Sequence, residues 1–340
     1  MARSDVEGTI VKKTWRSFAA LASAGMLLLA GCGSDSGSSS TASAGGSDTE
    51  YKIGITQIVS HASLDAAREG FKDGLADAGL KVSYDEQNAQ ADQATASSIA
   101  SKFASADLDL VLAIATPTAQ ATAQVISDVP IVFTAVTDPV AADLVASNEA
   151  PGANVTGTTD MNPVAEQIGL VKQVAPDAKT VGVIYSSGEV NSAVQVELAR
   201  EAAAAQGLEL VEKTITTTGE VLQAAQSLDV DAIYVPTDNN VVAGLDSVLQ
   251  VAEDRKIPVI AGETESVSKG ALITYGLDYY ELGKQTAEMA VKILTEGADP
   301  ATMSVESQKT PKLVINTTAA ERMGVTIPQS LLDKADETVN

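Results

Sequence analysis

The feature that most constrains the fold of this chain is a pattern of β-rich and helical runs that occurs twice. Lys52 to Ile55 (KIGI) recurs as Thr180 to Val183 (TVGV), 128 positions later (180 − 52). The segments AGLKV from Ala78 and VPIV from Val129 recur at the same offset as QGLEL and IPVI. Strands that alternate with helices are typical of a parallel sheet. We therefore expect two similar α/β lobes, although any two flavodoxin-like units would share part of this pattern.

Local signals mark the ends of several elements in both halves. Gly79 and Gly207 follow the first helical pattern of each half, where a glycine supplies the left-handed residue that ends a helix. Phe133 and Tyr234 lie within strand patterns, which predicts that both belong to the core. A final strand is expected over Lys312 to Ile315.

The predicted helix starts also correspond between the halves. Asp109 to Thr116 matches Asp231 to Asp238 at an offset of 122 (231 − 109). Thr116-Pro117 predicts an N-cap followed by proline at the first helical position, and Asp238 would cap the equivalent helix. Asp278 is expected to cap a later helix.

The N-terminus carries a basic region and then an apolar run from Phe18 to Ala30, too short to span a bilayer. The run ends in Leu29-Ala30-Gly31-Cys32, which resembles the lipobox of bacterial lipoproteins. The pattern predicts a signal peptide over residues 1–31 and lipidation of Cys32. Residues 32–50 would then form a Ser/Gly-rich tether. The alternative is a buried apolar helix with an unreactive thiol.

Composition excludes several classes of function. The chain has 45 acidic and 22 basic residues and a net charge of −23, which argues against nucleic acid and anionic lipid as partners. One cysteine and one histidine provide neither an internal disulfide nor a metal cluster, so no metal and no cofactor are expected. A nucleophile elbow, a phosphate-binding loop and a zinc-protease motif are all missing from the sequence. The chain is therefore predicted not to be an enzyme.

Polar loops are expected where the strands of each lobe end. Ligands of open parallel sheets bind at the carboxyl ends of the strands, so two facing lobes would enclose a cleft. The expected loops cover residues 57–65, 116–118, 134–138, 186–192, 238–240 and 262–263. They are rich in hydroxyl, amide and Asp side chains and poor in Lys and Arg. A helix N-terminus can hold a carboxylate and an Asp can hold an ammonium, so the cleft suits a zwitterion.

Sixteen side chains or backbone positions of these loops and the adjoining helix starts are candidate ligand contacts. They are Gln57, Ile58, His61, Leu64, Thr116, Pro117, Thr118, Thr137, Asp138, Ser187, Glu189, Asn191, Asp238, Asn239, Gly262 and Glu263. Thr116, Thr118 and Asp238 could instead be helix caps, although a cap also directs its polar groups towards the cleft. His61 could be a solvated loop residue.

Five longer segments resemble one known family. They begin at Ile53 (IGITQI), His61 (HASLDAAREGF), Pro130 (PIVFTAVTDP), Val235 (VPTDN) and Thr274 (TYGLDYYELG). The family is that of the ABC-transporter substrate-binding lipoproteins, whose better-known members bind aromatic amino acids such as tryptophan, phenylalanine and tyrosine. The likeness covers the chain from about Tyr51 to about Ile327.

The resemblance implies a type I periplasmic-binding-protein fold, a clamshell of two Rossmann-like lobes joined by three crossover strands. The first lobe would comprise residues 51–160 plus 277–308, and the second residues 161–276 plus 309–337. It also implies that the carboxylate of the ligand meets the Thr116–Thr118 loop and Thr137, and that its ammonium meets Asp238. The side chain of the ligand would lie near Gln57, Ile58, His61 and Leu64.

These observations together predict the extracytoplasmic substrate-binding component of an ABC importer, anchored to the cell membrane by lipid. The expected ligand is an L-amino acid, with an aromatic one favoured, and the expected partners are a permease and its ATPase. The chain is expected to be a monomer. The alternatives are a nucleoside, a branched amino acid or a signalling molecule as the ligand. A transcription regulator of the same fold is countered by the lipobox and by the lack of a basic headpiece.

Overall fold

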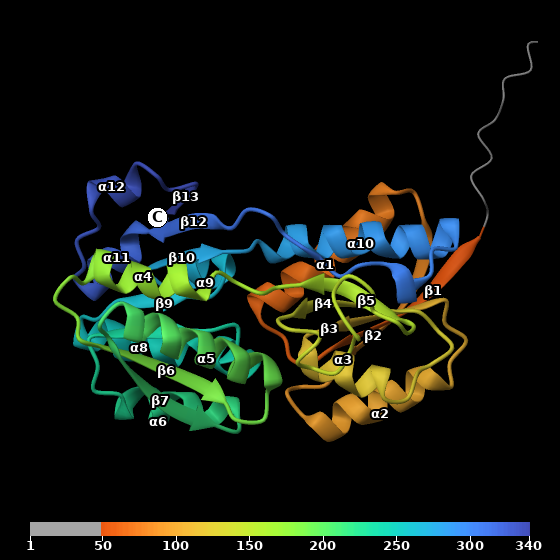
Figure 1. Ribbon diagram of the computed structural model, residues 1–340, viewed down its shortest axis with the longest axis horizontal. Helices are drawn as coiled ribbons and strands as arrows, with labels where there is room; N and C mark the ends of the chain where they lie inside the picture. Colours follow the sequence, from red (N-terminus) through yellow and green to blue (C-terminus); the bar gives the residue numbers. More distant parts are fainter. Residues whose placement is uncertain (1–48) are drawn as a thin grey trace, which may run out of the picture. The chain divides into compact units, whose positions relative to one another are not determined.

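Two β-sheets organise the chain in the computed structural model, which describes residues 49–340 (Figure 1). Residues 49–340 belong to one compact unit. The predicted signal peptide, the lipidation site at Cys32 and nearly all of the predicted tether lie outside the described residues. Among the described residues, no helix combines the length and the apolar character that a membrane span requires.

The first sheet has the strand order β11-β5-β4-β3-β1-β2, and all of its pairs are parallel. Its strands are β1 (Glu50–Gln57), β2 (Lys81–Asn88), β3 (Leu110–Ile114), β4 (Ile131–Val136), β5 (Val155–Thr159) and β11 (Glu306–Ser307). Its helices are α1 (Ala62–Asp77), α2 (Gln93–Ala104), α3 (Thr116–Ala123) and α10 (Tyr279–Glu296). A short 3-10 helix, Pro300–Thr302, precedes β11.

The second sheet has the order β13-β12-β10-β9-β8-β6-β7. Its strands are β6 (Thr180–Ser186), β7 (Glu209–Ile215), β8 (Ala232–Val235), β9 (Val259–Ala261), β10 (Ile273–Gly276), β12 (Lys312–Asn316) and β13 (Glu337–Val339). Its helices are α4 (Val164–Val174), α5 (Val190–Ala205), α6 (Val221–Ser227), α7 (Asn239–Ala243), α8 (Leu245–Arg255), α9 (Thr264–Lys269), α11 (Thr317–Met323) and α12 (Gln329–Leu332), with a 3-10 turn at Thr218–Glu220. Its other pairs are parallel, as expected, and the pair β10–β12 is antiparallel, a detail that the sequence did not predict.

The two sheets repeat the same strand order, β2-β1-β3-β4-β5 in one and β7-β6-β8-β9-β10 in the other. Local details repeat as well. A Cβ atom on Gly54 would lie 2.8 Å from the Leu108 side chain, and one on Gly182 would lie 2.9 Å from that of Leu228. Both glycines therefore leave room for a leucine that follows the neighbouring helix, and the two predicted α/β lobes are confirmed.

Each lobe has its own hydrophobic core. Phe71 and Phe133 are fully buried in the first lobe, and Tyr234 and Ile260 in the second. The core positions predicted for Phe133 and Tyr234 are confirmed. The central strand β3 is buried along its whole length, as expected of a parallel strand covered by helices on both faces.

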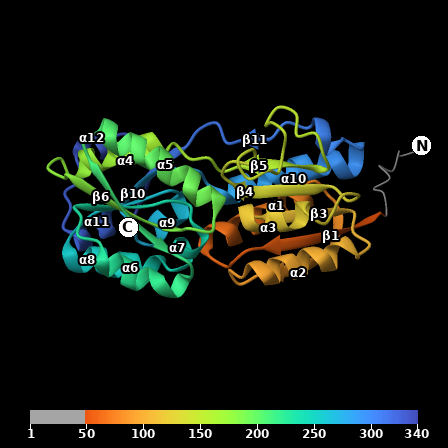
Figure 2. The same ribbon diagram turned by 60° about the horizontal axis from the view of Figure 1, so that its bottom comes forward.

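The chain passes between the sheets three times, after β5, after β10 and after β11. The connections comprise residues 160–163, 277–278 and 308–311, and the expected lobe boundaries fall within or next to them. As a result α10 joins the first lobe although it follows β10 of the second. Figures 1 and 2 show α10 beside α1 in both views.

Most predicted helix ends agree with the structure. Gly79 and Gly207 have φ angles of 75° and 67°, and Asp238 and Asp278 cap α7 and α10 by accepting hydrogen bonds from backbone N–H groups. The N-cap predicted for Thr116 is wrong. Ala115, with a φ of 81°, occupies the N-cap position, so Thr116 is already the first residue of α3.

Candidate functional site

A narrow cavity of about 10 Å³ lies between the two lobes, at the carboxyl ends of the strands. The first lobe lines it with His61, Ser63, Leu64, Ala135, Asp160 and Tyr279, and the second with Asn191, Thr237, Asn239, Val242 and Glu263. Ala135 lies near the end of β4, and the other residues follow β1, β5, β6, β8, β9 and β10. The cavity therefore occupies the place where open α/β sheets bind their ligands.

Four side chains of the cavity carry a buried polar atom that has no hydrogen-bond partner. The atoms are His61 Nδ1, Ser63 Oγ, Asp160 Oδ1 and Asn191 Oδ1. Among residues 49–340 only Thr56 and Thr116 have a side-chain atom in the same condition. Because a buried unpaired polar group costs roughly 1–3 kcal/mol, their concentration here indicates groups arranged to meet a polar ligand.

The N-terminus of α1 forms one wall of the cavity. His61 is its N-cap residue, in an extended conformation and without a side-chain capping bond. Ser63 and Leu64, in the first turn, line the cavity. The 16-residue helix thus directs its first turn and the Ser63 hydroxyl at the cavity, an arrangement that favours an anion.

Asp160, on the first connection, meets Tyr279, the first residue of α10. The Tyr279 hydroxyl donates a hydrogen bond to Asp160 Oδ2, and Oδ1 is left without a partner. Burial raises the pKa of Asp160 above its ordinary value. Burial and the Asp160 carboxylate raise the pKa of Tyr279, so its hydroxyl stays protonated. Asp160 can accept a further hydrogen bond from a cationic group.

Two glutamates extend this acidic side. Glu263 caps α9 by accepting hydrogen bonds from the backbone N–H of Ser266, at 2.8 Å, and from its hydroxyl. Glu265 accepts one from the Tyr279 backbone N–H at 2.9 Å. Burial and the Glu263 carboxylate raise the pKa of Glu265 well above its ordinary value.

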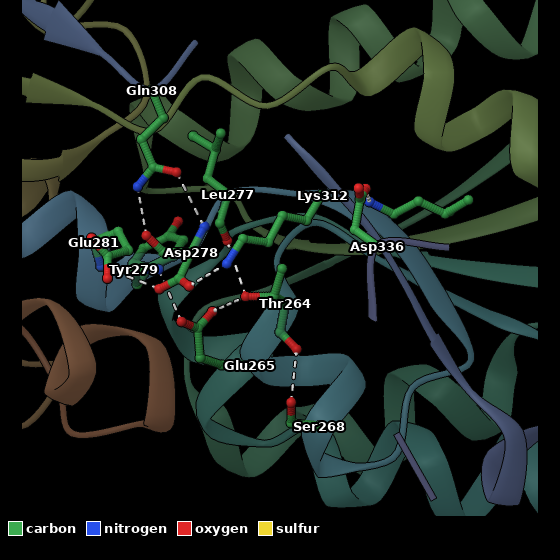
Figure 3. A network of polar contacts seen from close by, with 11 residues as sticks. Thr264, Glu265, Ser268, Leu277, Asp278, Tyr279, Glu281, Gln308, Lys312 and Asp336 are labelled. Atoms are coloured by element: carbon green, nitrogen blue, oxygen red, sulfur yellow. Dashed lines mark hydrogen bonds and ion pairs between the residues drawn. The ribbon is translucent and has the colours of Figure 1, made fainter. Parts of the chain in front are cut away.

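Hydrogen bonds tie the three connections to one another, and Figure 3 shows those between the second and the third. Asn162 Oδ1 accepts from the Leu277 backbone N–H at 3.3 Å, which joins the first connection to the second. Gln308 Nε2 donates to the Asp278 carbonyl at 2.6 Å, and Lys312 Nζ lies 2.9 Å from Asp278 Oδ2. The three connections are therefore linked to one another by hydrogen bonds in this arrangement of the lobes.

The cavity includes five of the candidate residues chosen from the sequence. They are His61, Leu64, Asn191, Asn239 and Glu263. Ile58, Ser187 and Glu189 line a neighbouring hollow of about 170 Å³ between the lobes. Their contacts with a ligand remain predictions.

Asp238 has a different environment. Its carboxylate accepts hydrogen bonds from the backbone N–H and hydroxyl of Ser186, from the Ser192 hydroxyl and from the Val241 backbone N–H, and it does not line the cavity. The adjacent Glu189 carboxylate accepts from the Asn239 side chain at 2.6 Å. Burial and the Asp238 carboxylate raise the pKa of Glu189 to about 7. Asp238 and Glu189 thus organise the loops of the second lobe.

Several other candidates make contacts within the protein. Thr118 donates its hydroxyl hydrogen to the Ile114 and Ala115 carbonyls, and Asp138 Oδ1 accepts from the backbone N–H groups of Val140 and Ala141.

The remaining candidates behave similarly, with one exception. Gln57 donates to Asp65 at 2.8 Å, and the Gly262 carbonyl accepts from Gln167 at 3.0 Å. Thr137 Oγ1 accepts from Gln195 Nε2 of the other lobe at 3.3 Å. Thr116 is the exception, since its buried hydroxyl has no partner, and Pro117 follows it in the first turn of α3.

Sequence reasoning missed six residues of the cavity: Ser63, Ala135, Asp160, Thr237, Val242 and Tyr279. Asp160 directly follows β5, so the same end-of-strand argument that selected the other loops could have found it. Tyr279 follows a predicted cap, and no sequence pattern connects it with Asp160.

Comparisons with known proteins agree with this geometry. A family model described as ABC transporter substrate binding protein matches residues 52–339. A protein named tyrosine-binding protein, from Clostridioides difficile (strain R20291), is 44% identical over 300 residues, which cover 86% of this chain and 87% of that protein.

Two solved structures give information on the conformation. The ABC domain from Streptococcus pneumonia in complex with L-Trp is 38% identical, with a TM-score of 0.82 and coverage of 86% of this chain and 100% of that chain. The ligand-free, open structure of a substrate-binding protein with adhesive properties from Clostridium difficile is 45% identical, with a TM-score of 0.64 and coverage of 85% and 99%. The higher TM-score belongs to the ligand complex despite its lower identity. The two lobes are therefore arranged more as in the ligand complex than as in the open, ligand-free structure.

The family match and the identity to the relatives both extend over most of the chain. The predicted type I periplasmic-binding-protein fold is confirmed, and family membership implies an extracytoplasmic location and partnership with a permease and its ATPase. This chain belongs to the ABC transporter substrate-binding proteins and is the substrate-binding component of an ABC transporter.

Proposed function

We propose that this protein captures an aromatic L-amino acid in the cavity between its lobes and delivers it to the permease. The observation that carries the proposal is the group of four unpaired buried polar atoms around the cavity. The relatives support the aromatic class, since one is named a tyrosine-binding protein and another is solved with L-Trp.

The proposed orientation follows from charge. The ammonium of the ligand lies against Asp160 Oδ1 and near Glu263, and the carboxylate lies at the Ser63 hydroxyl and the first turn of α1. We propose Asp160 for this contact rather than Asp238, whose oxygens already accept four hydrogen bonds within the protein. The apolar residues Leu64 and Val242 face the ring.

The aromatic part requires the lobes to open and close again around it, because a cavity of about 10 Å³ has room for roughly one water molecule. Closure removes the ligand from water, which strengthens its contacts with the charged groups. His61 and Asn239, on opposite lobes, would both contact the enclosed ligand.

Isothermal titration calorimetry of the full chain tests this function. L-tyrosine, L-tryptophan and L-phenylalanine are expected to bind, and L-leucine, adenosine and ribose are not. Ser63→Ala is expected to weaken the binding of L-tyrosine by up to about tenfold, because one hydrogen bond to the carboxylate is lost. Ser97→Ala, which changes an exposed serine of α2, is the control. Equal heats for every L-amino acid would contradict the ligand class.

We also propose that the protein is held to the membrane by a lipid on Cys32. The support is the lipobox-like run and the polar segment that follows it. Cys32→Ser is expected to abolish incorporation of radiolabelled palmitate and to release the protein from the membrane fraction. A variant that remains membrane-bound without label would refute the anchor.

A further inference from the structure

The cavity is lined by acidic side chains and by no basic side chain that is charged at neutral pH. Asp160 and Glu263 are carboxylates, 2% and 1% exposed, and neither Lys nor Arg is among the lining residues. The Glu265 carboxyl accepts a hydrogen bond from the backbone N–H of Tyr279, which also lines the cavity, as Figure 3 shows. The positive charge that helps to lower the pKa of His61 belongs to Lys269. The Lys269 side chain is 41% exposed, and its Nζ lies 3.7 Å from Asp246 Oδ1.

His61 does not supply the missing positive charge. Burial lowers the pKa of its imidazole to about 4, and the Asp65 carboxylate offsets only part of this effect. At neutral pH the imidazole is therefore uncharged. The remaining polar groups of the lining, Ser63, Asn191, Thr237 and Asn239, are neutral too.

This imbalance affects the two charged ends of an amino acid differently. An ammonium beside Asp160 Oδ1 pairs with an unsatisfied buried carboxylate, which is a strong, charge-assisted interaction. A carboxylate finds only neutral donors and adds a negative charge to a cavity that already holds two acidic side chains.

We propose that the cavity requires the ammonium of its ligand and tolerates the loss of the carboxylate, so that aromatic primary amines are ligands as well. The proposal rests on the proposed function, in which this cavity encloses an aromatic amino acid. Asp160 is the residue that determines this specificity, and Ser63 contributes only when a carboxylate is present.

Three matched ligands test the proposal by calorimetry on the full chain. L-tyrosine has both charged groups, tyramine lacks the carboxylate, and 4-hydroxyphenylpyruvate has a keto group in place of the ammonium. We expect tyramine to bind within about tenfold of L-tyrosine, and the keto acid to bind at least about a hundredfold more weakly, from the strength of neutral and charged hydrogen bonds. Tryptophan, tryptamine and indole-3-pyruvate form a second series.

Two variants test separately the contacts of the ammonium and of the carboxylate of the ligand. Asp160→Asn keeps the shape of the side chain and is expected to weaken L-tyrosine and tyramine alike by at least about tenfold. Ser63→Ala is expected to weaken L-tyrosine and to leave tyramine unchanged. Asp107→Asn removes a carboxylate that is 96% exposed and pairs with Lys52, and serves as the charge control.

The outcomes distinguish this proposal from the proposed function. If L-tyrosine and L-tryptophan bind but neither amine does, the inference is wrong and the proposed function stands. If the keto acid binds as well as L-tyrosine, the inference is wrong in the same way. If none of the aromatic ligands binds, both are wrong. Should Asp160→Asn fail to fold, the Ser63→Ala comparison of tyrosine with tyramine still decides.

Discussion

His61 is the only histidine in the chain, and it lies where the two lobes meet. It is the N-cap residue of α1 in the first lobe, and it shares the cavity with Asn239 of the second. The environment of its imidazole therefore depends on closure of the lobes. An NMR resonance of this one imidazole can therefore report whether the two lobes are open or closed.

We predict that NMR titration of His61 gives a pKa of about 4 in the closed, ligand-saturated protein, because burial disfavours the charged imidazole. In the urea-unfolded chain the value should be about 6.5. Between these values the unfolded chain binds a proton that the closed form does not. His61 therefore lowers the free energy of unfolding of the closed form as pH falls from about 6.5 to about 4. A titration near 6.5 in the saturated protein would contradict the enclosed imidazole.

At the scale of single residues, the sequence predicts the roles that depend on residues nearby in the chain. Asp238 and Asp278 were recognisable as caps because a cap bonds within its own helix turn. The binding role of Asp238 could not be judged in the same way, because Ser186 and Ser192, which occupy its oxygens, come from another loop. Thr116 was misplaced by one residue because the positive φ of Ala115 reflects the exit from β3.

At the scale of elements, helices α1 and α10 pack closely against each other at glycine residues. A Cβ atom on Gly283 would lie 2.0 Å from the Ala67 carbonyl oxygen, and one on Gly70 would lie 2.0 Å from that of Tyr280. Both neighbours are backbone atoms, so no side chain can move aside. The close packing of the two helices depends on these positions.

Gly283→Ala is therefore expected to lower the free energy of unfolding by about 1–3 kcal/mol, as overpacking in a core does. Gly169→Ala is the matched control, because Gly169 also lies inside a helix and its added Cβ would have only a side-chain atom 3.9 Å away. That substitution should stabilise the protein by roughly 0.5–1 kcal/mol through helix propensity. Urea unfolding measures both, and equal effects of the two variants would refute the contact.

Periodicity and glycine positions predicted the elements of both lobes because these signals are local. The antiparallel pairing of β12 with β10 and the short strand β13 were not predicted. β12 begins directly after the third connection, and nothing in its own residues fixes its direction. The direction of β12 is therefore determined by its tertiary contacts with β10.

At the scale of the whole molecule, closure depends on a few contacts, since each lobe has its own core. One of these contacts is the 3.3 Å hydrogen bond from Gln195 to the Thr137 hydroxyl. The sequence could not predict an open or a closed state, because both states keep the same cores and differ in bonds of this kind.

Thr137→Val removes that acceptor and keeps the volume of the side chain. We expect the closed form to lose about 1 kcal/mol relative to the open form, a change of about fivefold in their ratio. Small-angle X-ray scattering should show a larger radius of gyration without ligand and a return to the wild-type value at saturation. Thr295→Val, at an exposed threonine of α10, is the control. An unchanged radius of gyration in both variants would show that this hydrogen bond does not stabilise the closed form.

The three connections also determine the order in which the chain can fold. Asp73 on α1 and Tyr280 on α10 are hydrogen-bonded although they lie 207 positions apart. A chain that emerges from its N-terminus presents the first lobe without the helix that completes it, and most of the second lobe emerges before α10 does. The second lobe in turn waits for β12. Neither lobe is therefore a contiguous fragment that can be produced alone, because the first needs β11 and the second needs β12 before it is complete.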